Sequence, residues 1–539
     1  MELAESEMTM TRLLQHRFAL SRRHLFQFAG AAVAGGFALT LDERPALAQA
    51  VFSDYPFQLG VAAGDPAADG FVIWTRLAPR PLERDRGMPA QAVEVAWEVA
   101  SDVGFKTILQ SGKAFARPEL GHSVHVEVAG LTPATVHYYR FFAGREESAR
   151  GRVRTLPAAT AAVSSARFGI AGCQHFEQGS YIAHRKLSEE SLDFIFFYGD
   201  YIYEGRSART RNAAGGPFEN PRQHVGDEIY SLDDYRRRYS QYRMDPDLQA
   251  AHASTGWFVV WDDHETDNNW AADLDQDGTS PALFNLRRQA AAQAYYEFMP
   301  LRLTSLPVGP SMQIFRRATF GDLMSLQFLD TRQYRSDQPC GDKWGACGEL
   351  DRPEAEMMGL RQEKWLYEGL SASKARWNVL AQQVMVMDLD RDPGPQYAAN
   401  IDSWGGYRTP RARLLKALRD RRVANPIILT GDEHQNYAGQ VFLDSANPEG
   451  PPIAAEFVTT SISSGGDGMD QRPDMVKIQA ANPALKFNNA QRGFAVCEVT
   501  PDRWETSFKV MDRITDRGGT LKTRAKATVA AGSSIIAIS

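Results

Sequence analysis

Hydrophobic residues between positions 55 and 155 occur in short runs that alternate with polar positions or are rich in β-branched and aromatic side chains. Such runs predict strands of a sheet with one buried face. They cover residues 71–77, 93–99 and 123–128. Glycine and proline mark residues 60–66 and 131–133 as turns between these strands. The pattern therefore predicts a small β domain over residues 51–157.

From about residue 166 the pattern changes to apolar runs separated by long stretches with helical periodicity. This alternation is typical of an α/β domain with a buried sheet, and we expect one over residues 158–539. The predicted strands are 167–171, 194–197, 257–261, 326–329, 379–386 and 427–429. The predicted helices are 235–242, which follows an N-cap at Ser231, 286–298 and 361–370. Residues 527–539 are small and apolar and fit either a last strand or a tail.

Residues 1–50 are predicted to be a targeting signal. Arg22 and Arg23 precede an apolar run of small residues over 26–41, and residues 46–50 supply a cleavage pattern. This order is typical of a cleaved signal peptide, and the paired arginines indicate the twin-arginine type. The alternative, a membrane anchor, needs about 20 apolar residues, and the run is shorter. We expect the twin-arginine export machinery to deliver a periplasmic or secreted protein without a stable membrane anchor.

Composition narrows the function classes. The chain has 539 residues, 43% of them hydrophobic and 23% charged, which is the profile of a soluble globular protein. A net charge of −6 disfavours a general binder of nucleic acid, so we expect no nucleic-acid-binding patch. Four cysteines are too few for a disulfide scaffold. We expect a monomer.

Side chains that can bind metals follow four of the apolar runs in the second part of the chain. They lie in the segments 172–175, 199–204, 262–265 and 431–434. Ligands of α/β sheets bind at the carboxyl ends of strands. One aspartate at such a place is commonly a helix cap, but four segments in chain order are difficult to explain by capping alone. The sequence therefore predicts a metal site.

The types of donor in these segments indicate the kind of metal. A carboxylate can bridge two cations roughly 3.5–4 Å apart, the arrangement used for phosphoryl chemistry. A thiolate, a phenolate and a carboxylate together form a strongly anionic set that suits a trivalent or strongly Lewis-acidic ion. Aspartate and asparagine oxygens suit a hard divalent ion such as calcium.

The motifs resemble those of the PhoD-type alkaline phosphatase/phosphodiesterase family, within the metallophosphoesterases. The resemblance covers nearly the whole chain, from the twin-arginine signal and the small β part onwards. It rests on Gly-Cys-Gln, Gly-Asp-Tyr-Ile-Tyr-Glu, Trp-Asp-Asp-His-Glu followed by Asn-Asn, residues 329–335, residues 402–407 and Gly-Asp-Glu-His. Together these motifs are highly specific.

The resemblance implies a fold, two metals and a set of ligands. The implied fold is a pair of packed mixed β-sheets flanked by helices, metallophosphoesterase-like, preceded by a small β-sandwich. The segment 131–140 is similar to the part of fibronectin-type sandwiches that carries the tyrosine corner. The implied cofactors are Fe(III) and Ca²⁺. Iron would be bound by Cys173, Asp200 and Tyr203, with Asp200 bridging, and the cluster would be completed by Asp262, Asn269, Asp432 and His434.

Two details of this ligand set are open or unusual. Asp262 and Asp263 are adjacent, so only one is expected to face the metals if the strand continues, and the motif spacing favours Asp262. The commoner two-metal phosphoesterases begin their motifs with Asp-x-His and end them with Gly-His-x-His. Here Cys173 replaces the opening acid, which favours the iron–calcium subtype. Which metal each ligand holds is left open.

Other residues invite weaker interpretations. His264 is the candidate catalytic residue, because histidine in the related motif stabilises the leaving group; His175 is the weaker candidate, and a structural hydrogen bond is an alternative for both. Residues 273–278 match the first half of a calcium-binding loop, but Phe284 replaces the glutamate that should close it. Cys340 and Cys347 are candidates for a disulfide.

The leading prediction is a secreted, metal-dependent alkaline phosphatase that hydrolyses phosphate monoesters and diesters by in-line attack on phosphorus. Its partner is a phosphate ester substrate whose identity the sequence does not give. Two alternatives are a phospholipase D-like phosphodiesterase and a non-catalytic secreted binding protein with a structural metal site. A structural site would be closed by protein ligands, whereas a catalytic site keeps an open position.

Overall fold

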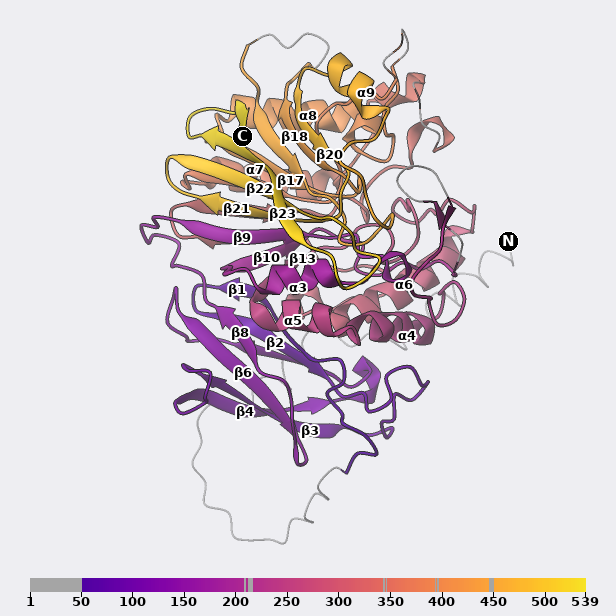
Figure 1. Ribbon diagram of the computed structural model, residues 1–539, viewed down its shortest axis with the longest axis vertical. Helices are drawn as coiled ribbons and strands as arrows, with labels where there is room; N and C mark the ends of the chain where they lie inside the picture. The colour runs from indigo at the N-terminus through magenta and orange to yellow at the C-terminus, as the bar shows by residue number, and fades with distance from the viewer. Residues whose placement is uncertain are drawn as a thin grey trace, which may run out of the picture. The chain divides into compact units, whose positions relative to one another are not determined.

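A computed structural model describes residues 51–539 except 208–209, 212–216, 343–344, 346, 393, 395–396 and 445–449. The predicted signal peptide lies outside the described residues. The described chain is a mixed α/β fold with several sheets, as the sequence predicted (Figure 1). Within that part of the chain, no helix is long and apolar enough to cross a membrane.

The largest sheet has ten strands in the order β24-β23-β22-β21-β9-β10-β13-β1-β2-β5. Its strands are β1 (Val61–Ala67), β2 (Gly70–Arg76), β5 (Ser123–Val128), β9 (Ala166–Ala171), β10 (Phe194–Phe197), β13 (Gly256–Val259), β21 (Gly493–Val499), β22 (Arg503–Met511), β23 (Leu521–Ala530) and β24 (Ile536–Ile538). Strands β9, β10, β13 and β1 pair in parallel, and their neighbours on both sides pair antiparallel. Figure 1 shows the C-terminal strands, in yellow, continuing the sheet beyond β9. The last residues are therefore strands rather than a tail.

The second sheet has seven strands in the order β14-β15-β16-β17-β19-β18-β20. Its strands are β14 (Arg316–Phe320), β15 (Met324–Phe328), β16 (Trp377–Ala381), β17 (Pro426–Thr430), β18 (Asn436–Val441), β19 (Ala454–Val458) and β20 (Leu485–Asn489). Strands β15, β16, β17 and β19 pair in parallel. The predicted strand 379–386 is shorter than expected, because β16 ends at Ala381.

Aromatic side chains pack the two large sheets against each other. The rings of Phe258 in β13 and Phe328 in β15 lie 4.5 Å apart between centroids, and those of Trp377 in β16 and Trp504 in β22 lie 5.8 Å apart. The helices are α3 (Ile182–Ser188), α4 (Leu232–Arg243), α5 (Pro246–Ser254), α6 (Pro281–Phe298), α7 (Gly359–Ala372), α8 (Arg408–Asp420) and α9 (Met475–Ala481). Helices α3 to α6 contribute to the core of the first sheet, and α7 to α9 contribute to that of the second. Both sheets are therefore covered on their outer faces.

The predicted helices form, and one has a clear sequence signal for its start. The side chain of Ser231 accepts a hydrogen bond from the main-chain N–H of Asp234, and the Asp234 carboxylate accepts one from the N–H of Ser231. This capping box satisfies two N–H groups that lack helical partners and fixes the start of α4. Short 3₁₀ helices cover Pro118–Leu120, Phe176–Gln178, Leu303–Ser305, Pro339–Gly341, Gly348–Asp351 and Trp404–Gly406.

The N-terminal part packs a five-stranded sheet against one end of the ten-stranded sheet. Its strands are β3 (Val93–Ala100), β4 (Ile108–Ala116), β6 (Val136–Ala143), β7 (Glu146–Glu147) and β8 (Gly151–Arg154). A separate two-stranded sheet pairs β11 (Thr210–Arg211) with β12 (Pro217–Phe218). Strands β1, β2 and β5 face the five-stranded sheet across a shared core, but β1 also pairs with β13. The sequence boundary near residue 157 therefore does not divide the large sheet.

One prediction for this part is wrong. Residues 60–66 were expected to be a turn, but Val61–Ala67 form β1, whose small side chains are buried between its neighbours. In the segment compared with a tyrosine corner, the hydroxyl of Tyr139 is buried without a hydrogen-bond partner among the described residues. The fibronectin-like detail is therefore not confirmed.

Candidate metal centre

The predicted ligands follow the carboxyl ends of parallel strands from both large sheets. Strands β9, β10 and β13 of the first sheet end shortly before Cys173, Asp200 and Asp262, and β17 of the second sheet ends shortly before Asp432. Because the sheets pack face to face, these turns meet at one edge of the fold. One site is thus assembled from both sheets, which chain order alone does not reveal.

Five of the seven predicted ligands have a left-handed backbone. The φ angles are 51° at Cys173, 54° at Asp200, 49° at Asn269, 64° at Asp432 and 53° at His434. Residues with side chains rarely adopt this region, and such strain clusters at functional sites. The turns after the strands therefore hold the ligands in a conformation that local preference alone would not select.

Glycines precede three of these ligands because the backbone approaches other groups closely there. A Cβ atom on Gly172 or on Gly431 would overlap the ring of Tyr198, and one on Gly199 would overlap Asp262. The Tyr198 hydroxyl lies 2.9 Å from the carbonyl oxygen of Thr460. The glycines of the Gly-Cys and Gly-Asp motifs thus allow the ligand turns to pack around one buried ring.

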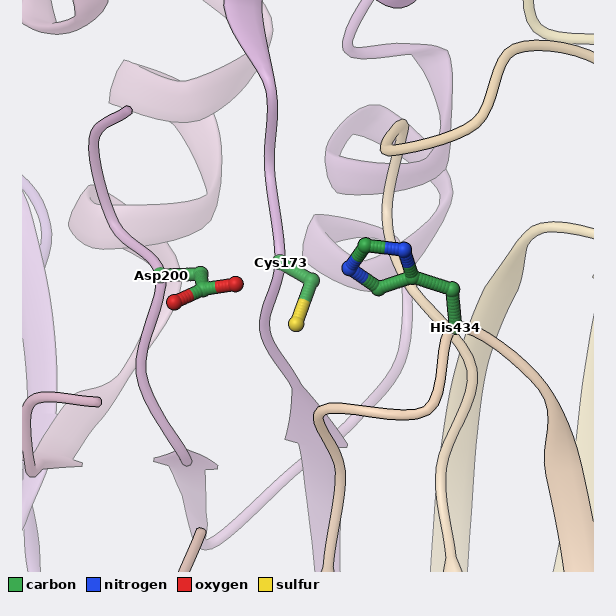
Figure 2. Close-up of side chains that lie close together, drawn as sticks. All are labelled: Cys173, Asp200 and His434. Atoms are coloured by element: carbon green, nitrogen blue, oxygen red, sulfur yellow. The ribbon is translucent and has the colours of Figure 1, made fainter. Parts of the chain in front are cut away.

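Three groups of donor atoms lie close enough to share metal ions. The groups are Cys173, Asp200 and His434; Asp200, Asp263 and His264; and Asp262, Asp263 and Asp432. Within each group the donor atoms lie within 4.8 Å of one another. Figure 2 shows the sulfur of Cys173 between the Asp200 carboxylate and the His434 ring. Asp200 and Asp263 each belong to two groups, as expected of carboxylates that can bridge.

Tyr203 joins the first group through its hydroxyl. This oxygen donates a hydrogen bond to Oδ2 of Asp200 at 2.7 Å and lies 3.2 Å from Nε2 of His434. The phenol oxygen is thus surrounded by donor atoms of other predicted ligands. Thiol, phenol, imidazole and carboxylate converge at this point.

Both adjacent aspartates reach the site, contrary to the expectation that only one would. Strand β13 ends at Val259, so the alternation of side chains along a strand no longer applies at Asp262 and Asp263. Oδ1 of Asp262 pairs with Nε of Arg332 at 2.6 Å. Oδ2 of Asp263 accepts a hydrogen bond from the N–H of Asn269 at 2.8 Å. The other oxygen of each aspartate has no hydrogen-bond partner in the part of the chain that the structure describes.

Asn269 lies beside this cluster, at the border with solvent. Its side-chain amide lies 3.4 Å from a carboxylate oxygen of Asp342, and its carbonyl oxygen accepts a hydrogen bond from Gln338. The structure therefore places Asn269 next to Asp263, through main-chain contact with that aspartate.

Carboxylate oxygens without hydrogen bonds make the site compatible with a cation. Oδ1 of Asp200, Oδ2 of Asp262 and Oδ1 of Asp263 are buried without hydrogen-bond partners among the described residues, although Oδ1 of Asp263 lies 3.7 Å from Nη2 of Arg332. Burial and the neighbouring carboxylates raise the pKa of Asp432 well above its ordinary value, and burial does the same for the pKa of Asp200. Buried acids this close favour either protonation or a shared cation. The acid and histidine groups are compatible with metal binding.

His264 lies next to the cluster and is held by a residue to which the sequence assigned no role. Its Nδ1 lies 2.7 Å from Oε2 of Glu204, whose Oε1 accepts a hydrogen bond from the N–H of Asn268. Burial opposes the charged ring, but the carboxylates of Glu204, Asp263 and Asp200 raise the pKa of His264 well above its usual value. Glu204 directly follows Tyr203 in the recognised motif, which was the only available signal for it.

Two further residues hold the turns of the site in place and were not predicted from the sequence. The Glu265 carboxylate accepts hydrogen bonds from the N–H groups of Asp200, Tyr201 and Asp262, at 3.1, 2.6 and 2.9 Å. It thereby ties the turn after β10 to the turn after β13. Arg332 is fully buried and pairs with Asp262 and with Asp402. It offsets part of the negative charge of the cluster.

The remaining candidate residues lie outside the three groups of donor atoms. His175 stacks on His224 and packs at a tilt against Tyr203, with ring centroids 4.4 Å apart, and burial lowers its pKa to about 3. Asp275, in the loop that resembles a calcium motif, accepts a hydrogen bond from the N–H of Thr279 and closes a turn. Cys340 and Cys347 form a disulfide, as the sequence suggested.

Known protein families and solved structures are similar to this chain. The family model of PhoD-like phosphatases matches residues 168–508, and that of their N-terminal domain matches residues 43–157. Alkaline phosphatase D of Bacillus subtilis (strain 168) is 46% identical over 475 residues, which cover 88% of this chain and 81% of that protein. The solved structure named Structure of PhoD has a TM-score of 0.87 at 45% identity, over 89% of this chain and 91% of that one.

Proposed function

The chain belongs to the PhoD-like phosphatase family and is a hydrolase of phosphate esters, and from this premise we propose that it works through the metal centre described above, on phosphate monoesters and diesters. The observation that carries the proposal is the convergence of thiol, phenol, imidazole and carboxylate donors with three buried carboxylate oxygens that lack hydrogen bonds within the described residues. Family membership does not favour a phospholipase D-like activity or a non-catalytic binding protein.

We assign Fe(III) to Cys173, Asp200 and Tyr203 and Ca²⁺ to the oxygen-rich side of the cluster. Asp200 would be the ligand common to both ions, because its carboxylate belongs to two of the three groups of donor atoms. The other ligands are Asp262, Asn269, Asp432 and His434. We add Asp263, because it belongs to two of the three groups of donor atoms and accepts a hydrogen bond from Asn269. When bound, such ions supply positive charge that stabilises the transition state of phosphoryl transfer.

The remaining parts of the reaction are assigned to side chains of the protein itself. His264 is half-exposed beside the buried acids and donates a proton from Nε2 to the leaving alcohol. Glu204 accepts the Nδ1 hydrogen of the ring, which keeps Nε2 directed away from Glu204 and holds its orientation. Glu265 ties the turn of Asp200 to the turn of Asp262, and Arg332 pairs with the Asp262 carboxylate. Asn269, Asp432 and His434 are half-exposed, so substrate enters on their side.

We further infer that the chain is exported by the twin-arginine machinery to the periplasm or the medium and acts there as a monomer. The paired Arg22 and Arg23 and the short apolar run support export. We also propose domain boundaries at residues 50 and 157.

The experiment that tests the proposed activity is a substrate panel. The purified protein, analysed for metals, is assayed on p-nitrophenyl phosphate and bis-p-nitrophenyl phosphate at alkaline pH. Hydrolysis of both esters that disappears on chelation supports the proposal. Full activity in a protein free of metal would contradict the role of the metal centre.

A further inference from the structure

A buried polar segment that no motif contains lies against the metal centre. Residues 459–466 follow β19 and read Thr-Thr-Ser-Ile-Ser-Ser-Gly-Gly. The side chains of residues 459–464 are 0–1% exposed, although five of the six are hydroxyl residues. Buried hydroxyls need hydrogen-bond partners, so their contacts show what the segment does.

The contacts join the two halves of the centre. The N–H of Ile462 donates to the carbonyl oxygen of Gly172 at 3.0 Å, which ties the segment to the turn after β9. The hydroxyl of Thr460 donates to the carbonyl oxygen of His434 at 3.1 Å, on the turn after β17. The segment therefore spans from the turn that bears Cys173 to the turn that bears His434.

The side chain of Ser464 reaches the donor atom of a predicted ligand. Its Oγ lies 2.7 Å from the hydroxyl oxygen of Tyr203 and 2.8 Å from the carbonyl oxygen of Cys173. It also accepts a hydrogen bond from the N–H of His175 at 3.1 Å. One side chain thus contacts the backbone of one predicted iron ligand and the donor atom of another.

The number of hydrogen bonds that the Ser464 hydroxyl can make limits its role at this position. A serine hydroxyl has one hydrogen to donate and two lone pairs to accept with. One lone pair is used by the N–H of His175, and the single hydrogen has two acceptors, the Cys173 carbonyl and the Tyr203 oxygen. While Tyr203 is a phenol, its own hydrogen is directed to Asp200. Once the oxygen of Tyr203 carries negative charge, it is the stronger acceptor, because hydrogen bonds to charged groups are about twice as strong.

We propose that Ser464 is a positioning residue of the metal centre, which donates a hydrogen bond to the oxygen of Tyr203 when that oxygen binds a metal. Residues that hold metal ligands in this way affect metal affinity by about 10- to 100-fold. The inference rests on the proposed function only in that Tyr203 is a ligand. It adds a role for residues 459–466 in setting the distance between Cys173 and His434.

The neighbouring serine provides a matched control. Ser463 is as deeply buried, and its hydroxyl donates to the carbonyl oxygen of His175 at 2.9 Å; among the described residues it has no hydrogen bond to the side chain of a predicted ligand. Ser463→Ala and Ser464→Ala each remove one buried hydroxyl from the same segment. A general effect on folding would appear in both variants, and thermal unfolding of the metal-free proteins measures it.

The experiment compares metal retention and visible absorption in the full-length wild type, Ser463→Ala, Ser464→Ala and Ser464→Thr. During dialysis against a chelator, Ser464→Ala should lose metal about tenfold faster than Ser463→Ala. Any phenolate absorption band of the wild type should shift in Ser464→Ala alone. Ser464→Thr, which keeps the hydroxyl, should restore both properties towards wild type.

The possible failures are distinguishable. A wild type that binds metal, together with Ser464→Ala and Ser463→Ala variants that retain it equally, would overturn the role of Ser464 and leave the metal centre intact. Equal and faster loss in both variants would show a merely structural segment and would also overturn the inference. A wild type that binds no metal would contradict the proposed function itself.

Discussion

Oε2 of Glu204 lies 2.7 Å from Nδ1 of His264, so the candidate proton donor of this enzyme is held by a carboxylate from a neighbouring turn. The two residues are 60 positions apart and follow β10 and β13. This pair fixes which nitrogen of the ring is directed away from Glu204. The pairing leads to the first prediction.

Replacing His264 by Asn should lower turnover by roughly 10²- to 10⁴-fold on alkyl phosphates, the range of general acid catalysis. The loss should be much smaller on p-nitrophenyl phosphate, because p-nitrophenolate leaves without a proton. Steady-state kinetics on the two esters measures this difference. Glu204→Gln should show the same preference with a smaller loss. Equal losses on both esters, or loss of metal from His264→Asn, would show that His264 is a ligand rather than a donor.

Calcium removal should abolish activity. A strong calcium chelator should stop turnover, and added calcium should restore much of it, because the oxygen-rich side of the cluster suits a hard ion. Activity measured before chelation, after chelation and after readdition tests this point. Magnesium serves as the control ion, since its smaller size and strict octahedral geometry fit a flexible carboxylate site less well. Unchanged activity after complete removal of calcium would exclude this assignment.

The purified protein should absorb visible light, since a phenolate bound to ferric iron gives a charge-transfer band. Tyr203→Phe should abolish that band, because it removes the oxygen that lies 2.7 Å from Asp200. Tyr235→Phe is the matched control, because Tyr235 is also buried and its hydroxyl donates to the carbonyl oxygen of Thr266 instead. A colourless, fully active protein that contains only zinc would be incompatible with iron.

Export should depend on the arginine pair. Changing both Arg22 and Arg23 to Lys should stop the mature protein from appearing outside the cytoplasm, because the pair is the part of the signal that the receptor reads. Cell fractionation with an activity assay measures this, and the mature N-terminus is expected at Val51. Normal export of the double variant would exclude the twin-arginine assignment.

The turns that bear the predicted ligands could be located in the sequence because each of them follows an apolar strand directly. Cys173, Asp200 and Asp432 each follow a glycine, and the structure explains these glycines by close packing at Tyr198 and Asp262. Local pattern was sufficient here because strand, glycine and ligand lie within a few residues of one another.

Residues that reach the site from distant parts of the chain were not predictable in this way. Ser464 lies 261 positions from Tyr203, and Arg332 lies 70 from Asp262. Their roles depend on how the two sheets pack, which no local pattern encodes. Asp263 was set aside by an alternation rule that ends with β13 at Val259. Strand β1 was mistaken for a turn because its glycine and proline outweighed its small buried residues.

The central claim is that a bridging carboxylate at Asp200 holds the metals that catalysis needs. The most direct measurement is metal content and turnover of Asp200→Asn beside Asp275→Asn, since each change removes one carboxylate charge and keeps the volume. Asp200→Asn should lose metal and on the order of 10³-fold or more in turnover, because metal charge supplies several kcal/mol and each ~1.4 kcal/mol is tenfold. Asp275→Asn should leave both unchanged, because Asp275 only closes a turn at Thr279. If the two variants keep metal and activity equally, Asp200 does not hold the catalytic metals.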